Sequence, residues 1–187
     1  MEIAVVQDGT GATPADTAAP PVDPALFRRV MGSFASGVTV VSTVADGQVR
    51  AMTVNAFMSG SLDPPLCVIS IRKKARMHPL LIEAGHFGVS VLAKNQERLS
   101  SHFAGAPVAD LALELLWAGR TPLLANAAAV IASDIDTQYD CGDHTLFIGA
   151  IRYLAAHGRP PLLVHHGRYA GVTHATEPAP EWVVDFW

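Results

Sequence analysis

Apolar residues in the N-terminal part of the chain follow a helical spacing before they follow a strand spacing. In one stretch they recur every three or four positions, at Leu26, Phe27, Val30, Met31 and Phe34. Asp23 suits the N-cap and Pro24 the first turn, because proline has no N–H to leave unpaired there. The pattern predicts a helix that begins at Asp23-Pro24 and ends at Gly37.

Strand signals dominate the rest of the chain. Asp46-Gly47 is typical of a hairpin turn. Pro64 and Pro65 cannot donate to a sheet, so residues 61–65 are predicted to form a turn. The strands predicted from β-branched and apolar runs span positions 38–44, 48–55, 66–72, 87–92, 128–137, 145–155 and 161–166.

Short helices are predicted between some of these strands. One covers residues 79–84, and Asn95 can cap another that carries Leu99 and Phe103. Residues 108–125 fit either a helix or irregular structure. Strands do not alternate with helices as a doubly wound sheet requires, so the sequence predicts a mainly β protein, a barrel with a few short peripheral helices.

The chain of 187 residues is long enough for one domain, which we place at residues 23–172. Residues 1–22 are rich in Ala, Thr, Pro, Gly and Asp and are expected to form a disordered tail or a short arm. Residues 173–187 form a C-terminal tail whose Trp182 and Trp187 are expected to pack or to lie at an interface.

Composition limits the partners. Half of the residues are apolar and only 16% are charged, so we expect part of the surface to be covered in a homodimer. The net charge of −4 argues against binding to nucleic acid. No apolar stretch is long enough to span a membrane and no secretion signal is evident, so a cytoplasmic location is expected.

The cysteine and histidine patterns give no reason to expect a metal site. Cys67 and Cys141 are too few for a disulfide framework, and neither lies in a metal-spaced pair. His165 and His166 are adjacent, and on a strand they would point to opposite faces.

Three segments carry candidate chemistry, and each also has a plainer interpretation. Residues 52–66 form a strand of small and hydroxyl side chains that runs into the proline turn, where a flat ligand such as an isoalloxazine can lie along the backbone. The alternative is a strand edge that faces solvent. Residues 72–76 hold four cations that can clamp a phosphate, or form a solvated loop. His144, next to Asp143, can orient a nicotinamide, or form a structural pair.

In their order along the chain, these segments resemble a known family. Phe27-Arg28-Arg29, Gly37 to Val41, Thr53 to Phe57, the Ser61 to Leu66 turn and Gly142-Asp143-His144 are similar to the short-chain flavin reductases. These proteins are also called the flavin reductase-like, FMN-binding split-barrel family, the reductase components of two-component monooxygenases. The resemblance covers roughly residues 25–172 and includes Leu99-Ser100 and Phe103-Ala104-Gly105.

The resemblance implies a dimeric split Greek-key barrel with flavin bound near the subunit interface. The flavin-binding residues that it implies are Thr53, Val54, Asn55, Ala56, Ser59, Ser61, Arg72, Lys73, Lys74, Arg76, Phe103 and Ala104. Those implied on the nicotinamide side are Asp143, His144 and Tyr169. The family often has hydroxyl residues where Lys74, Ala75 and Met77 stand here, which shifts phosphate binding to the cations. Met58 likewise replaces a common Ser or Thr.

The implied activity is hydride transfer from C4 of NADH or NADPH to N5 of FMN or FAD, with reduced flavin supplied to a partner monooxygenase. No side chain needs to act as a catalytic acid or base, because the cofactors supply the chemistry. Two alternatives remain open. The protein can retain its flavin and reduce another acceptor such as ferric iron or a quinone, or it can be a flavin-binding module without catalysis.

Overall fold

The computed structural model describes residues 21–173, in which three helices and twelve strands are present. The helices are α1 (Pro24–Met31), α2 (Met77–Ala84) and α3 (Glu97–Phe103). The strands are β1 (Ser36–Gly37), β2 (Thr39–Ala45), β3 (Gln48–Val54), β4 (Phe57–Ser61), β5 (Leu66–Arg72), β6 (His86–Val91), β7 (Leu115–Ala118), β8 (Thr121–Leu124), β9 (Ala129–Cys141), β10 (His144–Ala156), β11 (Leu163–His165) and β12 (Arg168–Ala170).

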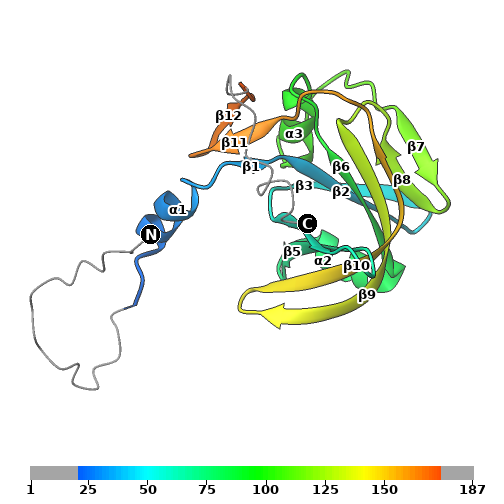
Figure 1. The fold of residues 1–187 in the computed structure, drawn as a ribbon, viewed down its shortest axis with the longest axis horizontal. Coiled ribbons are helices and arrows are strands. Elements are labelled where there is room, and N and C mark those ends of the chain that lie inside the picture. The colour runs from blue at the N-terminus through cyan, green and yellow to red at the C-terminus, as the bar shows by residue number, and fades with distance from the viewer. Residues whose placement is uncertain (1–20, 174–187) are drawn as a thin grey trace, which may run out of the picture.

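A seven-stranded antiparallel sheet in the order β3-β2-β6-β9-β10-β5-β4 forms the body of the molecule (Figure 1). Its two outermost strands, β3 and β4, are consecutive in the chain and are joined only by Asn55 and Ala56. Two residues cannot span the width of a flat seven-stranded sheet, because neighbouring strands lie about 4.8 Å apart. The sheet therefore curls until its edges approach each other, and the barrel stays split between β3 and β4.

Side chains alternate between two apolar cores, one on each face of the curled sheet. In β2, Val41 belongs to the inner core and Val40 to the outer one. Phe87 and Phe147 are fully buried inside the barrel, where Met77 and Leu81 of α2 join them. Because both faces of β2 are covered, nearly the whole strand is buried. Its residues are accordingly all apolar or hydroxyl-bearing, without polar alternation.

The outer core is covered by the β7–β8 hairpin and by α3. Leu123 and Leu124 of β8 and Leu99 and Phe103 of α3 pack onto it. Gly88 of β6 allows the hairpin to approach closely, since a Cβ atom there would lie 2.6 Å from Leu123 Cδ2. The sequence left open whether residues 108–125 form a helix or irregular structure. The structure shows that they contain the β7–β8 hairpin, and β9 is the next strand in the chain.

The first helix is shorter than predicted. Asp23 accepts hydrogen bonds from the N–H groups of Ala25 and Leu26, which confirms the predicted cap. The helix ends at Gly32 rather than at Gly37, because Ser36 and Gly37 instead pair with β11 as strand β1. Helix α1 has no buried residue and stands off the barrel (Figure 1).

Three other expectations are corrected. Gln96 rather than Asn95 precedes α3, and its side-chain oxygen accepts from the N–H of Ala93. Residues 57–61 form a separate strand, β4, and residues 168–170 form β12; neither strand was predicted. The other predicted strands and the Asp46-Gly47 turn are confirmed, with β5 at the predicted ends.

The predicted tail at 1–22 and the C-terminal tail at 173–187 lie almost entirely outside the described residues. Their structure, including that of Trp182 and Trp187, therefore stays a prediction. No helix within residues 21–173 is both long and apolar enough to cross a membrane.

Candidate functional site

The predicted flavin strand lies at the seam where the two edges of the sheet meet. Asn55 and Ala56 are exposed, whereas the Val54 side chain is buried in the inner core, which leaves only its backbone for a ligand. The carbonyl of Ala56 accepts a hydrogen bond from the N–H of Ser70, 3.0 Å away, and this bond ties the seam to β5. The seam is thus anchored on one side and open to solvent on the other.

Helix α3 is fixed to the seam through Ser100. The hydroxyl of Thr53 donates to the Ser100 carbonyl at 2.7 Å, and the hydroxyl of Tyr169 donates to Ser100 Oγ at 2.9 Å. Ser100 is 2% exposed. Thr53, Tyr169 and the Phe103-Ala104 end of α3, from three distant parts of the sequence, are thereby brought together.

The loop of residues 72–76, called the basic loop below, lies next to Gly142-Asp143-His144 because β5 and β10 pair antiparallel. Arg72 lies opposite His144 in the register, and the N–H of Lys73 donates to the Asp143 carbonyl at 2.9 Å. Arg72, Lys73, Lys74 and Arg76 are all exposed. The structure therefore places the predicted phosphate and nicotinamide groups side by side.

Asp143 and His144 form a close pair. Nδ1 of His144 lies 2.7 Å from Oδ1 of Asp143. This hydrogen bond, with a smaller contribution from the Arg72 charge, holds the pKa of Asp143 below its usual value. The carboxylate fixes the imidazole and engages Nδ1, so Nε2 is the nitrogen that can serve a ligand.

Ser59 and Ser61 lie farther along β4, away from the basic loop. Ser59 pairs with Cys67 and Ser61 with Leu66, whereas Arg72 is at the other end of β5. A strand advances about 3.3 Å per residue, so Ser61 and Arg72 are separated by roughly 20 Å along the strand pair. A single ligand that contacted both would have to extend along β4 and β5.

Two residues that sequence reasoning did not propose as site residues are central to this arrangement. Ser100 anchors two predicted site residues, and Asp140 lies with its Oδ2 3.2 Å from Nζ of Lys73. Ser100 was part of the family motif and one helical turn before Phe103. Asp140 had no comparable signal, because its contact with Lys73 depends on strand register.

Comparison with known proteins decides the family. The sequence profile described as "Flavin reductase like domain" matches residues 31–173, most of the chain. The protein belongs to the flavin reductase-like family. The resemblance noted from the sequence is thus confirmed, and the domain limits of 23–172 stay a prediction.

Three similar proteins illustrate the family. This flavin reductase-like chain is 39% identical to an NADH-dependent flavin reductase of a Rhodococcus species, over 80% of this chain and 87% of the relative. It is 39% identical to the reductase component of 4-hydroxyphenylacetate 3-monooxygenase from Thermus thermophilus, over 76% of this chain and 91% of the relative. The NADH:FAD oxidoreductase SgcE6 of Streptomyces globisporus, solved with NAD and FAD fragments, superposes with a TM-score of 0.76 at 36% identity, covering 85% and 100% of the two chains. The predicted split-barrel fold is confirmed.

Within residues 21–173, no group of three His, Cys, Asp or Glu side chains is placed to hold an ion. The expectation that His165 and His166 point to opposite faces is wrong, because His166 lies in a turn with φ of 47°. Their ring centroids are 4.3 Å apart.

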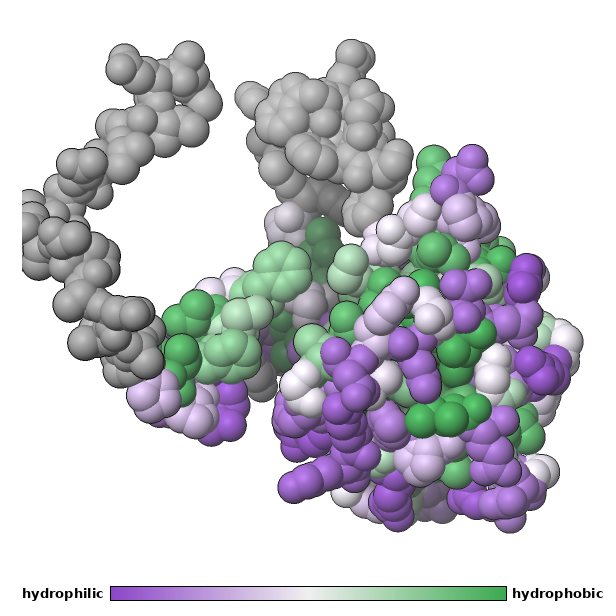
Figure 2. Space-filling view, turned by 90° about the horizontal axis from the view of Figure 1, so that it is seen from below, coloured by the Kyte–Doolittle hydropathy of each residue, from purple (hydrophilic) through white to green (hydrophobic). Residues whose placement is uncertain are grey.

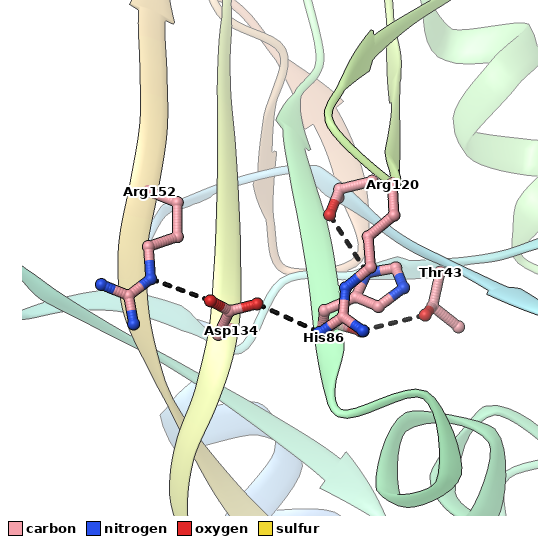
Figure 3. Close-up of polar contacts among 6 residues, drawn as sticks. Thr43, His86, Arg120, Asp134 and Arg152 are labelled. Atoms are coloured by element: carbon pink, nitrogen blue, oxygen red, sulfur yellow. Dashed lines mark hydrogen bonds and ion pairs between the residues drawn. The ribbon is translucent and has the colours of Figure 1, made fainter.

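A second polar cluster of the flavin reductase-like domain lies at the other end of β6 from the seam (Figure 3). Asp134 lies between two guanidinium groups, with Arg152 Nε 2.8 Å from Oδ2 and Arg120 Nη2 3.2 Å from Oδ1. Next to them His86 is only 4% exposed, and its Nδ1 lies 3.1 Å from the Thr121 hydroxyl. The cluster fastens the β7–β8 hairpin to β6, β9 and β10.

Burial of His86 makes the stability of the domain depend on pH. Burial, and to a smaller extent the charge of Arg120, lowers the pKa of His86 from its ordinary 6.5, while Asp134 opposes this. The unfolded chain then takes up a proton more readily than the folded chain. The stabilisation from neutral His86 is therefore complete above pH 6.5 and is lost as the pH falls below it.

We predict that His86→Asn flattens this acid limb. Asn keeps a hydrogen-bonding group for Thr121 but cannot titrate. The wild-type free energy of unfolding should fall more steeply than that of the variant between pH 6.5 and 5, by at most about 1.4 kcal/mol per pH unit for one proton. Urea unfolding at several pH values measures both slopes. Equal slopes would show that His86 takes up its proton equally in the folded and the unfolded chain, so that its pKa is not lowered by folding.

Proposed function

We propose that this protein is an NADH-dependent flavin reductase that supplies reduced flavin to a separate monooxygenase. Its relatives carry these names and match it over most of their length. The structural observation that carries the proposal is the meeting of three groups at one end of the barrel. The pairing of β5 with β4 and with β10 brings these groups together. They are the open seam at Asn55-Ala56, the basic loop and the Asp143–His144 pair.

The residues present fit a phosphorylated flavin. The loop of residues 72–76 presents four exposed cations, and Arg in particular offers a planar fork for phosphate oxygens. Thr53 is engaged with Ser100, so its contribution is to hold α3 against the strand that the flavin ring would follow. Asn55 and the seam backbone are exposed and can hydrogen-bond the polar edge of the ring.

When both cofactors are bound, the nicotinamide supplies a hydride that the flavin ring accepts. The chain's own task is to bind, to orient and to exclude water. His144, fixed through Nδ1 by Asp143, presents Nε2 to position the nicotinamide carboxamide. The Tyr169 hydroxyl donates its hydrogen bond to Ser100. The role of Tyr169 on the nicotinamide side is therefore to hold β12 against α3.

Among the cofactor alternatives, the comparisons favour NADH as the hydride donor. The Rhodococcus and Streptomyces relatives are both named for NADH. Relatives are named for FAD and for FMN, so the flavin selectivity has to be measured. We also propose a cytoplasmic location, where NADH is produced and used.

A homodimer is the second part of the proposal, and α1 is its main support. The apolar side chains of this helix are 43–58% exposed at Leu26, Phe27, Val30 and Met31, and Phe34, which follows the helix, is 77% exposed. Figure 2 shows this apolar surface on the arm that stands off the barrel. Exposed side chains of this size on one helix face are normally covered by a partner, and we propose a second copy of the chain.

Turnover of added flavin tests the function. In anaerobic stopped-flow mixing, the protein should reduce all of a large molar excess of FMN or FAD over protein when NADH is at least equimolar to the flavin, at a rate proportional to protein concentration. A protein that retains its flavin would need a second acceptor such as ferric iron. A binding module would reduce no flavin, and that result would contradict the proposal.

The dimer is tested on α1. We expect light scattering at micromolar concentration to give the dimer mass, and Phe27→Glu with Val30→Glu to weaken association by about tenfold or more, because two apolar contacts are replaced by charges. Ala25→Glu, on the opposite side of the same helix, is the matched control and should leave the dimer intact. A monomeric wild-type protein would refute this part of the proposal.

His144→Asn tests the nicotinamide side. Asn retains a hydrogen-bonding edge without a titrating ring, so we expect a higher KM for NADH, nearly normal flavin affinity and a fall in kcat of about tenfold or less. A general-acid role would instead lower kcat by about 100-fold and remove a limb of the pH profile. A lower melting temperature with unchanged kinetics would indicate a purely structural pair.

A further inference from the structure

The four cations of the basic loop are not equivalent. Nζ of Lys73 lies 3.2 Å from Oδ2 of Asp140, near the tip of the β9–β10 hairpin. Within residues 21–173, Arg72, Lys74 and Arg76 form no ion pair at 4.0 Å or less. Among the contacts of the described residues, Lys73 is therefore the one cation of the loop that has an ion-pair partner before any phosphate binds.

The Asp140 carboxylate accepts a hydrogen bond from one buried residue, Thr145, which is itself paired with a second residue, His78. Thr145, its register partner on β10, donates to Asp140 Oδ1 at 3.4 Å. The Thr145 oxygen lies 2.9 Å from Nε2 of His78 on α2, and Thr145 is 3% exposed. Since the Thr145 hydroxyl hydrogen goes to the carboxylate, its oxygen accepts from the imidazole. The Thr145 hydroxyl thus helps to keep the Asp140 carboxylate beside Lys73, while most of the Asp140 side chain is exposed.

The local charge is lower than the sequence of the loop suggests. Asp143 lies in the turn of the same β9–β10 hairpin, and its carbonyl accepts from the Lys73 N–H. The two carboxylates, Asp140 and Asp143, offset half of the four positive charges in residues 72–76. A phosphate that binds to this loop has to share Lys73 with Asp140 and lies within the field of both carboxylates.

We propose that Asp140 is a specificity-determining residue whose carboxylate competes with the flavin phosphate for Lys73. The inference rests on the proposed flavin reductase function and on the loop as the phosphate site. The competition lowers the advantage that a phosphorylated flavin has over riboflavin. It also lets the flavin leave more readily, which suits a protein that passes reduced flavin to another enzyme.

Asp140→Asn is the decisive variant, since it removes the charge and keeps an oxygen that can accept from Thr145. Asp140 is 79% exposed through its side chain, so we expect no effect on folding. The Kd values of oxidised FMN and riboflavin are measured by flavin fluorescence titration. FMN should bind about two- to fivefold more tightly, the range for an exposed ion pair, and riboflavin should be unchanged. The gain should shrink at high salt.

Two further variants isolate the cause. Asp136→Asn makes the same charge change four residues earlier on β9, at an exposed side chain without an ion pair in the described chain, and should leave the FMN-to-riboflavin ratio unchanged. In a Lys73→Ala background, Asp140→Asn should lose most of its FMN gain, because the contested cation is gone.

Three results would overturn the inference. They are an equal change for FMN and riboflavin, an equal gain in Asp136→Asn, and an undiminished gain without Lys73. If the wild-type protein turns over flavin with NADH, any of these three results leaves the proposed function intact. A wild-type protein that binds neither flavin and oxidises no NADH overturns the function and this inference together.

Discussion

The two-residue connection at Asn55 and Ala56 is the constraint on which the structure depends. It joins the first and last strands of a seven-stranded antiparallel sheet, so the sheet cannot stay flat. Curling creates an inside that aromatic and branched side chains fill, with Phe87 and Phe147 fully buried. It also creates an outer face that the β7–β8 hairpin and α3 cover. The seam where the edges meet is left without a continuous ladder, and the candidate site lies there.

The register of the surrounding strands decides which groups reach the seam. Pairing of β5 with β10 sets Arg72 opposite His144, and pairing of β4 with β5 brings Ala56 beside Ser70. Helix α3 is held by Thr53 and Tyr169 through one buried residue, Ser100. A register shift of one residue would turn these side chains to the other face and separate the groups.

An open site with partly neutralised cations agrees with a protein whose flavin must leave. The cofactors bring the reactive atoms, so the chain needs no acid–base pair of its own. The proposed function requires only orientation by His144, which Asp143 fixes, and moderate attraction by the basic loop. This also explains why each sequence signal is weak by itself. No single segment has to carry an unusual side chain, and only their order along the chain identifies the family.

Local sequence determined much of the fold. The ends of β5, the Asp46-Gly47 hairpin and the Asp23 cap follow from turn residues, strand runs and capping chemistry, which act over a few residues. The order of motifs identified the family and the predicted site residues. The tertiary structure decided what depends on distant pairing. Helix α1 stops at Gly32 because Ser36 and Gly37 pair with β11. The meeting of Asp140 with Lys73 and of Tyr169 with Ser100 follows from contacts between residues nearly 70 positions apart, which local propensity cannot encode.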